Sequence, residues 1–130
     1  MIYQNDFYQK LNKPVFTPEP KVFRIVWPIL YGLMTISFFI LLMLPNSFYR
    51  LAAIIIFIAQ LFFNLLYSPI FFILKKIKVS FFISIFLVFL VLILIIILLK
   101  ISLLSAVLLI PYLLWLIFAS ILNYYIVKLN

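Results

Sequence analysis

The chain has 130 residues, of which 70% are hydrophobic and 9% are charged, and its formal net charge is +8. A soluble domain is about half apolar and about a quarter charged, and a chain this short has too little interior to hide so much apolar surface. The composition therefore excludes a soluble globular fold and predicts an integral membrane protein.

Several residue types that carry chemistry are missing. Cysteine and histidine are absent, and the only acidic residues are Asp6 and Glu19. These absences exclude disulfides, thiol catalysis and the usual zinc sites, and they exclude a pair of carboxylates within the membrane for acid–base catalysis. We therefore expect no conventional catalytic residue, no metal site and no intrinsic cofactor.

Residues 1–24 are predicted to form an interfacial segment and a proline-rich loop that leads into the membrane. Tyr3, Phe7 and Leu11 recur at helical spacing among polar residues, a pattern typical of a helix at the membrane surface. The run KPVFTPEPK then contains three prolines, which indicates an ordered, non-helical loop. The first residues are too polar to be the apolar core of a signal peptide.

The remaining residues, 25–130, are predicted to form an all-α bundle of transmembrane helices. A helix rises about 1.5 Å per residue, so roughly 20 apolar residues cross the hydrocarbon core. Four runs have this length: 25–44, 51–74, 79–99 and 101–127.

The breaks between the four runs are PNSFYR, KKIK and the single Lys100. The sequence Pro45-Asn46-Ser47 favours a turn, and Ser47 is a suitable cap for the helix that follows. Lys100 is a weak break by itself. We nevertheless expect a tight turn there, because one unbroken helix across both apolar runs would be implausibly long.

Basic residues are divided unequally between the two sides of the predicted bundle. Alternate loops of a four-span protein share a side, and one side holds eight cations: Lys10, Lys13, Lys21, Arg24, Lys75, Lys76, Lys78 and Lys128. The other side holds Arg50 and Lys100. Short loops rich in lysine and arginine stay in the cytoplasm, so both termini are predicted to be cytoplasmic. The charge then reflects anchoring in the bilayer rather than nucleic-acid binding, with a site for acidic lipids as the alternative.

Polar and aromatic side chains recur at helical spacing on three of the spans. These stripes are Phe23, Trp27, Tyr31 and Met34 on the first span, Gln60, Asn64, Tyr67 and Phe71 on the second, and Pro111, Trp115, Ala119, Leu122 and Asn123 on the fourth. Amides are costly in lipid, so Gln60, Asn64 and Asn123 are expected to point into the bundle. The third span is expected to face mostly lipid, with Ser80 and Ser84 toward a neighbour.

The three stripes predict a cavity. Prolines 28, 69 and 111 each remove a backbone hydrogen bond and bend a helix, so three spans are expected to bow apart. Ala119 beside Trp115 would leave a recess next to a flat ring, which suits a flat hydrophobic ligand. The alternatives are that the amides only join helices and that tryptophan and tyrosine only anchor span ends. Anchoring alone would explain Trp27, but it fits Trp115 poorly because that residue lies near the middle of its span.

Three blocks of sequence resemble the signature of a known family. KPVF…VFRIVWPILYGLM resembles KPxFxPPxxVFxxVWxxLYxxM, AQLFFNLLYSPIFF resembles QLxxNxxWSxIFF, and PYLLWLIFASILNYYIVKLN resembles PYLxWxxFAxxLNxxIxxLN. The blocks lie in order and cover nearly the whole chain from Phe7. The chain is thus similar to the translocator protein family, also called tryptophan-rich sensory protein, TspO or peripheral benzodiazepine receptor type.

This resemblance implies a fold, a ligand class and a set of site residues. It implies a membrane fold of five helices, of which this chain would hold helices 2–5, and commonly a homodimer. It also implies a pocket, opening toward the cytosol, for porphyrins, haem-type tetrapyrroles, sterols or synthetic aromatic ligands. The positions that match family pocket residues or lie in the same motifs are Trp27, Tyr31, Asn64, Tyr67, Trp115, Ala119, Leu122 and Asn123. Leu122, Tyr124 and Lys128 fit the loose sterol-recognition pattern of the last helix.

The sequence departs from the family pattern in two respects. The family has a helix before the motif that reads FYQKLNKP in this chain, whereas only six residues precede it. The first helix is therefore expected to be absent or to lie upstream of Met1. Tyr67 and Lys21 stand where the family has tryptophan.

The leading hypothesis is a membrane receptor or carrier for a flat hydrophobic ligand such as protoporphyrin. The alternatives are a light-dependent enzyme that degrades porphyrin and a small membrane scaffold without a ligand. Without groups for proton transfer, porphyrin breakdown would have to be driven by light, and the resemblance implies Trp27 and Trp115 as redox partners. Tyrosine is harder to oxidise than tryptophan without a proton acceptor, so the exchange at Tyr67 predicts binding with little or no photodegradation.

Overall fold

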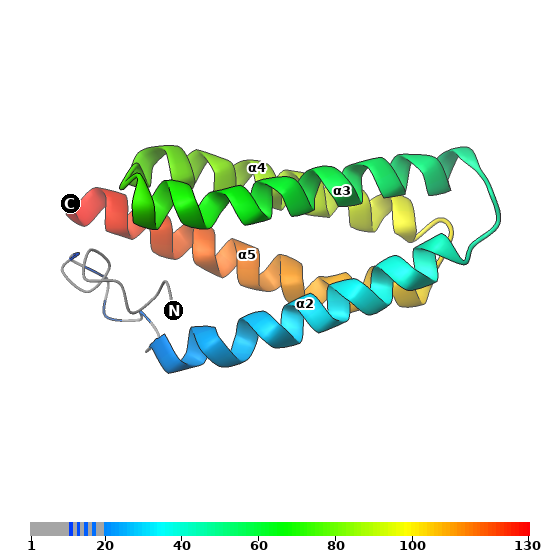
Figure 1. The fold of residues 1–130 in the computed structure, drawn as a ribbon, viewed down its shortest axis with the longest axis horizontal. Helices are drawn as coiled ribbons and strands as arrows, with labels where there is room; N and C mark the ends of the chain where they lie inside the picture. The colour runs from blue at the N-terminus through cyan, green and yellow to red at the C-terminus, as the bar shows by residue number, and fades with distance from the viewer. Residues whose placement is uncertain (1–10, 12, 14, 16, 18–19) are drawn as a thin grey trace.

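The computed structural model describes residues 20–130 and, before them, Leu11, Lys13, Val15 and Thr17. This part of the chain is helical and contains no strand. Its elements are α2 (Pro20–Leu42), α3 (Phe48–Ser68), the short π-helix η2 (Pro69–Ile73), α4 (Ile77–Leu98) and α5 (Leu103–Leu129) (Figure 1). The helices α2, α3, α4 and α5 are each long and apolar enough to cross a membrane, which confirms the predicted fold class.

The start of α2 differs from the expected boundary. The helix begins at Pro20, so residues 20–24 are helical and do not belong to the proline-rich loop. Proline is well suited to the first turn of a helix because the N–H that it lacks would have no partner there. The predicted interfacial helix around Tyr3 and Phe7, and most of the loop, lie outside the described residues.

Serine caps define the two turns at the end of the bundle away from the C-terminus. The hydroxyl of Ser47 accepts a hydrogen bond from the Arg50 backbone N–H at 3.1 Å, which confirms the predicted cap of α3. In the same way, Ser102 accepts from the Ser105 N–H at 3.2 Å and caps α5. The turn expected at Lys100 is therefore present, between α4 and α5.

Proline changes the end of α3 into a π-helix. Because Pro69 has no backbone N–H, the α-helical bond to the carbonyl four residues earlier cannot form. The backbone hydrogen bonds that follow Pro69 span more residues than the four of an α-helix. The Leu74 N–H bonds the Pro69 carbonyl at 3.0 Å, and the Lys76 N–H bonds the Ile70 carbonyl at 3.0 Å. This widened turn brings the chain into the short connection to α4.

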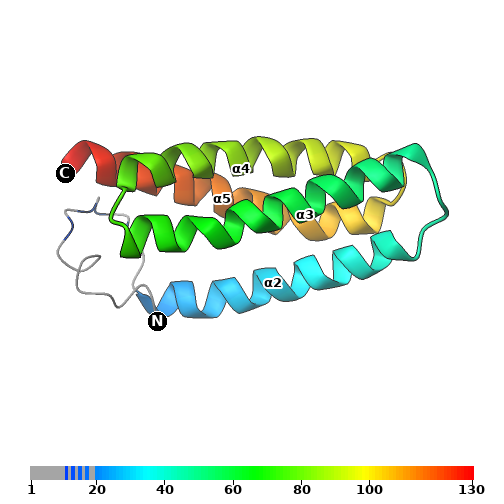
Figure 2. The same cartoon turned by 45° about the horizontal axis from the view of Figure 1, so that its top comes forward.

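Helix α4 packs against both α3 and α5 and lies on the side of the bundle away from α2 (Figures 1 and 2). Its buried stripe consists of Ser80, Ser84, Leu87, Val91, Leu94, Ile95 and Leu98. The two serines face neighbours as expected. Only 33% of this span is buried inside the bundle, which agrees with the expectation that the helix mostly faces lipid. A helix that is apolar all round gives no contrast between a face that packs and a face that meets lipid.

Helix α2 is held to α5 near one end and separates from α3 toward the other. Near the α2–α3 turn, the hydroxyls of Ser37 and Ser105 each donate to the other residue's backbone carbonyl, at 2.9 and 3.0 Å. Such small residues let two helices approach closely. Toward the end where the C-terminus lies, α2 diverges from α3 in the view of Figure 1. Pro28 and Pro111 lie inside α2 and α5 with their side chains exposed.

The two cations at the capped end have local partners. Arg50 donates to the Asn46 side-chain oxygen at 3.0 Å and to the Leu42 carbonyl at 2.9 Å, which satisfies a free carbonyl in the last turn of α2. The ammonium of Lys100 lies 5.4 Å from the centre of the Tyr49 ring, a cation–π contact. Within residues 20–130, the cations at the opposite end are Lys21, Arg24, Lys75, Lys76, Lys78 and Lys128.

This distribution predicts an orientation that a reporter can test. An alkaline phosphatase domain, which is active only outside the cytoplasm, is expected to be inactive when fused after Asn130. The same domain inserted at Asn46, in the turn between α2 and α3, is expected to be active. Activity at Asn130 together with silence at Asn46 would reverse the predicted orientation.

Candidate functional site

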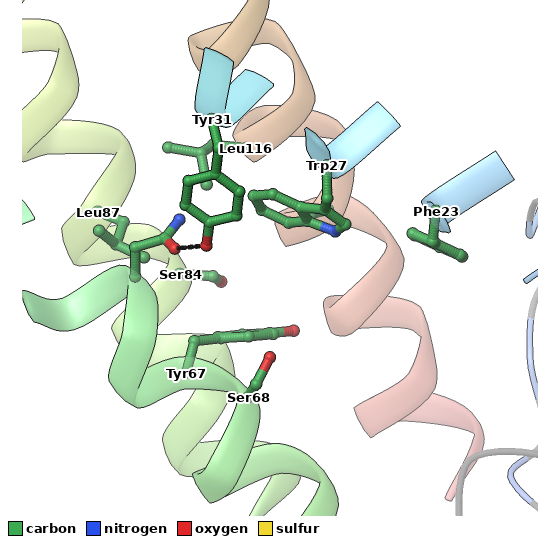
Figure 3. A pocket seen from close by; sticks show the side chains of 10 residues that line it. Phe23, Trp27, Tyr31, Tyr67, Ser68, Ser84, Leu87 and Leu116 are labelled. Carbon is green, nitrogen blue, oxygen red and sulfur yellow. Dashed lines mark hydrogen bonds between the residues drawn. The ribbon is translucent and has the colours of Figure 1, made fainter. Parts of the chain in front are cut away.

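A cavity of about 290 Å³ lies between the four long helices, in the half of the bundle nearer the C-terminus. It is lined by Phe23, Trp27 and Tyr31 of α2, Asn64, Tyr67 and Ser68 of α3, Ser84 and Leu87 of α4, and Leu116 and Ala119 of α5 (Figure 3). The volume is at the lower end of the range of about 300–1,000 Å³ that is usual for ligand pockets. The cavity is only partly enclosed.

Aromatic rings from α2 and α3 form opposite walls of this cavity. Phe23, Trp27 and Tyr31 are four residues apart, so they share one face of α2. Trp27 and Tyr31 lie side by side with ring centroids 5.7 Å apart. Tyr67 faces them from α3, below the Tyr31 hydroxyl in the view of Figure 3. The cavity is therefore bordered by aromatic rings from both α2 and α3.

A chain of polar side chains crosses the bundle behind this wall. The Tyr31 hydroxyl donates to Asn64 Oδ1, and Asn64 Nδ2 donates to the Tyr112 hydroxyl at 2.8 Å. Tyr112 in turn donates to Gln60 Oε1 at 2.7 Å, and Gln60 Nε2 lies 3.8 Å from the sulfur of Met34. The chain joins α2, α3 and α5, and it satisfies amides that would otherwise be costly in hydrocarbon. Gln60 and Asn64 are buried, as their residue type predicted.

Trp115 lies one layer behind the cavity wall. Its ring meets Phe23 edge-on at 5.5 Å and Trp27 edge-on at 6.3 Å, so it supports two rings that line the space. Its Nε1 is buried and has no hydrogen-bond partner among the described residues. The structure therefore places Trp115 beside the cavity-lining residues and not in the lining itself.

Leu122 and Asn123 are also buried, beyond the lining. Asn123 Nδ2 donates to the Tyr67 hydroxyl at 2.6 Å and to the Ser80 hydroxyl at 3.2 Å. These bonds orient the Tyr67 ring from the next layer. Leu122 packs in a small apolar cluster with Phe23 and Phe71. Asn123 points into the bundle as expected, but it contacts the lining residue Tyr67 and does not itself line the cavity.

The residues of the sterol pattern do not share one surface. Leu122 is 5% exposed, whereas Tyr124 is 48% exposed and Lys128 is exposed. Residues two apart on a helix point in nearly opposite directions. Leu122 therefore faces the bundle, while Tyr124 and Lys128 face outward.

The buried face of α5 differs from the predicted stripe. Pro111 is exposed, whereas the adjacent Tyr112 is fully buried. A tyrosine hydroxyl needs a hydrogen-bond partner in hydrocarbon, and α3 provides two partners for it. The need of a mid-helix tyrosine for such partners was the signal that could have identified this face.

Five lining residues were not among the predicted site residues: Phe23, Ser68, Ser84, Leu87 and Leu116. Phe23 lies in the predicted stripe of the first span, and Ser84 was expected to face a neighbour. Leu87 and Leu116 carry no distinguishing signal, because leucine is equally at home in lipid and in a bundle interior.

The sequence matches the model of the TspO/MBR family over residues 2–129. The chain belongs to this family. Among its relatives is the tryptophan-rich sensory protein of Cereibacter sphaeroides, which is 30% identical over 130 residues, covering 100% of this chain and 80% of the relative. The tryptophan-rich protein TspO of Archaeoglobus fulgidus is 34% identical over 125 residues, covering 95% of this chain and 80% of the relative. Protein CrtK of Rhodobacter capsulatus is 29% identical over 126 residues, covering 95% of this chain and 78% of the relative.

Family membership confirms the resemblance carried by the three sequence blocks. Five of the predicted site residues, all in those blocks, border one cavity: Trp27, Tyr31, Asn64, Tyr67 and Ala119. They come from α2, α3 and α5, so no single block contains the site. Only the packing of the TspO-type bundle brings them together.

Proposed function

We propose that this TspO-family membrane protein is a receptor or carrier that binds a flat hydrophobic ligand in the cavity between its four long helices. The observation that carries the proposal is the lining. Three aromatic rings of one α2 face and a fourth ring from α3 surround a space that also contains the Asn64 amide. Apolar pockets with a few polar groups are typical of small-molecule sites.

The proposed ligand class is a porphyrin or a related tetrapyrrole. Its flat conjugated ring suits stacking against Trp27, Tyr31 and Tyr67. Because the cavity is small and partly open, such a ligand would insert one edge and leave the rest near the open side. A sterol is the alternative, although its saturated rings gain less from an aromatic lining. Assembly as a homodimer stays a prediction from the family resemblance.

The two tryptophans provide a direct test of binding. Trp27 lines the cavity and Trp115 packs edge-on against Trp27 from behind, and the chain has no other tryptophan. Titration of the protein in lipid nanodiscs with protoporphyrin is therefore expected to quench nearly all tryptophan fluorescence, and the quenching should saturate. Quenching that stays linear, as for a free tryptophan derivative in the same nanodiscs, would favour a scaffold without a ligand.

Illumination of the same complex distinguishes a binding protein from an enzyme. We expect bound protoporphyrin to lose absorbance no faster than free ligand, because Tyr67 stands where the family has tryptophan and a tyrosine is harder to oxidise. Rapid loss in the wild type that disappears in Trp115→Phe would favour the light-dependent enzyme.

A further inference from the structure

The polar chain behind the cavity ends at a group that can only accept a hydrogen bond. Gln60 Nε2 lies 3.8 Å from the Met34 sulfur, and both side chains are buried. A thioether has no hydrogen to donate. The end of the Gln60 amide that faces Met34 must therefore be the NH₂ group, and the oxygen must face Tyr112.

The orientation of the Gln60 amide determines the direction of every hydrogen bond in this polar chain of side chains. Since Gln60 presents an oxygen, the Tyr112 hydroxyl donates to it. A tyrosine has one hydroxyl proton, so the Tyr112 oxygen can only accept from Asn64, which must present its NH₂ group. The Asn64 oxygen then faces Tyr31, and the Tyr31 hydroxyl donates its proton to that oxygen.

The Tyr31 hydroxyl oxygen therefore faces the cavity as a hydrogen-bond acceptor. Tyr31 lines the cavity, and its hydroxyl lies on the side where Ser84 and Tyr67 are placed (Figure 3). Its proton is committed to Asn64, so only a lone pair is left for a ligand. Hydrogen bonds in a chain polarise one another, which makes an oxygen that already donates a better acceptor.

We propose that the cavity selects a ligand with a hydrogen-bond donor, an N–H or O–H group that binds the Tyr31 oxygen. This inference rests on the proposed binding function and adds the polarity of the ligand. A pyrrole N–H at the inserted part of a tetrapyrrole has the required chemistry. Gln60 and Tyr112 do not line the cavity, so they act as positioning residues that set this preference from behind the wall.

Three rigid tricyclic molecules of nearly the same shape test whether the cavity selects a hydrogen-bond donor. Carbazole, dibenzofuran and fluorene differ only in the bridging group, which is N–H, O or CH₂. Equilibrium dialysis against nanodiscs, with empty nanodiscs subtracted, is expected to show carbazole binding about 3- to 10-fold more tightly than the other two. Equal affinities of the three would overturn the selection for a donor and leave the binding function intact. Failure of all three and of protoporphyrin to bind would overturn both proposals.

The variant Gln60→Met tests the direction of the chain from outside the cavity. Without the Gln60 oxygen, Tyr112 can donate to Asn64 once the amide turns over. Asn64 then donates to Tyr31, and the Tyr31 proton becomes available to the ligand. The preference is expected to invert, so that dibenzofuran binds more tightly than carbazole.

A matched variant separates this effect from a general loss of packing. Ser37→Ala removes a buried hydrogen bond between α2 and α5 that is not part of the polar chain. It is expected to keep the carbazole preference of the wild type, even if stability falls. A carbazole preference retained in Gln60→Met would overturn the proposed role of Gln60.

Discussion

Replacement of Ala119 by leucine is expected to lower the affinity for protoporphyrin at least about tenfold, which corresponds to about 1.4 kcal/mol. Ala119 lines the cavity from α5. A leucine side chain at this position would fill much of a space of about 290 Å³ and would keep a flat ring from entering. Saturable quenching of tryptophan fluorescence measures the affinity.

Stability must be measured beside affinity, because a larger side chain also strains its surroundings. Overpacking costs about 1–3 kcal/mol, but the empty cavity should accept part of the new side chain. Ala59→Leu is a suitable control, since Ala59 is partly buried on α3 and does not line the cavity. Unchanged affinity in a folded Ala119→Leu protein would mean that the ligand does not occupy this cavity.

Replacement of Tyr112 by phenylalanine is expected to have the largest effect on stability, lowering the free energy of unfolding by about 1–3 kcal/mol. The hydroxyl connects two buried amides, at 2.8 Å from Asn64 and 2.7 Å from Gln60. Its loss leaves a donor and an acceptor without partners in a hydrocarbon environment. Single hydrogen bonds in membrane proteins average only about 0.6 kcal/mol, but Tyr112 makes two.

Unfolding in mixed micelles of increasing denaturing detergent measures this loss. The matched control is Tyr124→Phe, because Tyr124 is exposed on the same helix and its change should stay within about 0.5 kcal/mol. Equal stability of the two variants would show that the polar chain contributes nothing to folding. A double variant, Tyr112→Phe with Gln60→Met, should cost less than the sum of the single changes, since it removes both partners of one bond.

The three amide side chains show which features of the bundle interior the sequence predicts and which it does not. Gln60, Asn64 and Asn123 were predicted to point inward from the cost of an amide in lipid alone, and all three are buried. Their roles differ, however. Asn64 lines the cavity, Gln60 lies behind it, and Asn123 orients Tyr67 from the next layer. A solvation cost determines that a group is inside, but only packing determines which partner it meets.

The sequence by itself determined the membrane environment, the four long helices and the Ser47 cap. These features depend on composition, on the length of apolar runs and on contacts within a few residues, so they are encoded locally. The blocks around Trp27, Asn64 and Ala119 also identified the family, because each block retains its residue types at the same spacing.

Only the tertiary structure decided which faces pack together. Helix α4 is apolar all round, so its sequence contains no signal that separates Leu87 in the cavity wall from a leucine in lipid. On α5, a rotation by one residue replaces Pro111 with Tyr112 on the buried face, and apolar periodicity cannot detect this shift in a helix that meets lipid on its other side. In a bilayer, burial offers little hydrophobic gain, so close packing and hydrogen-bond partners on neighbouring helices select the face. The partners of Tyr112 lie on α3, about fifty residues away in the sequence.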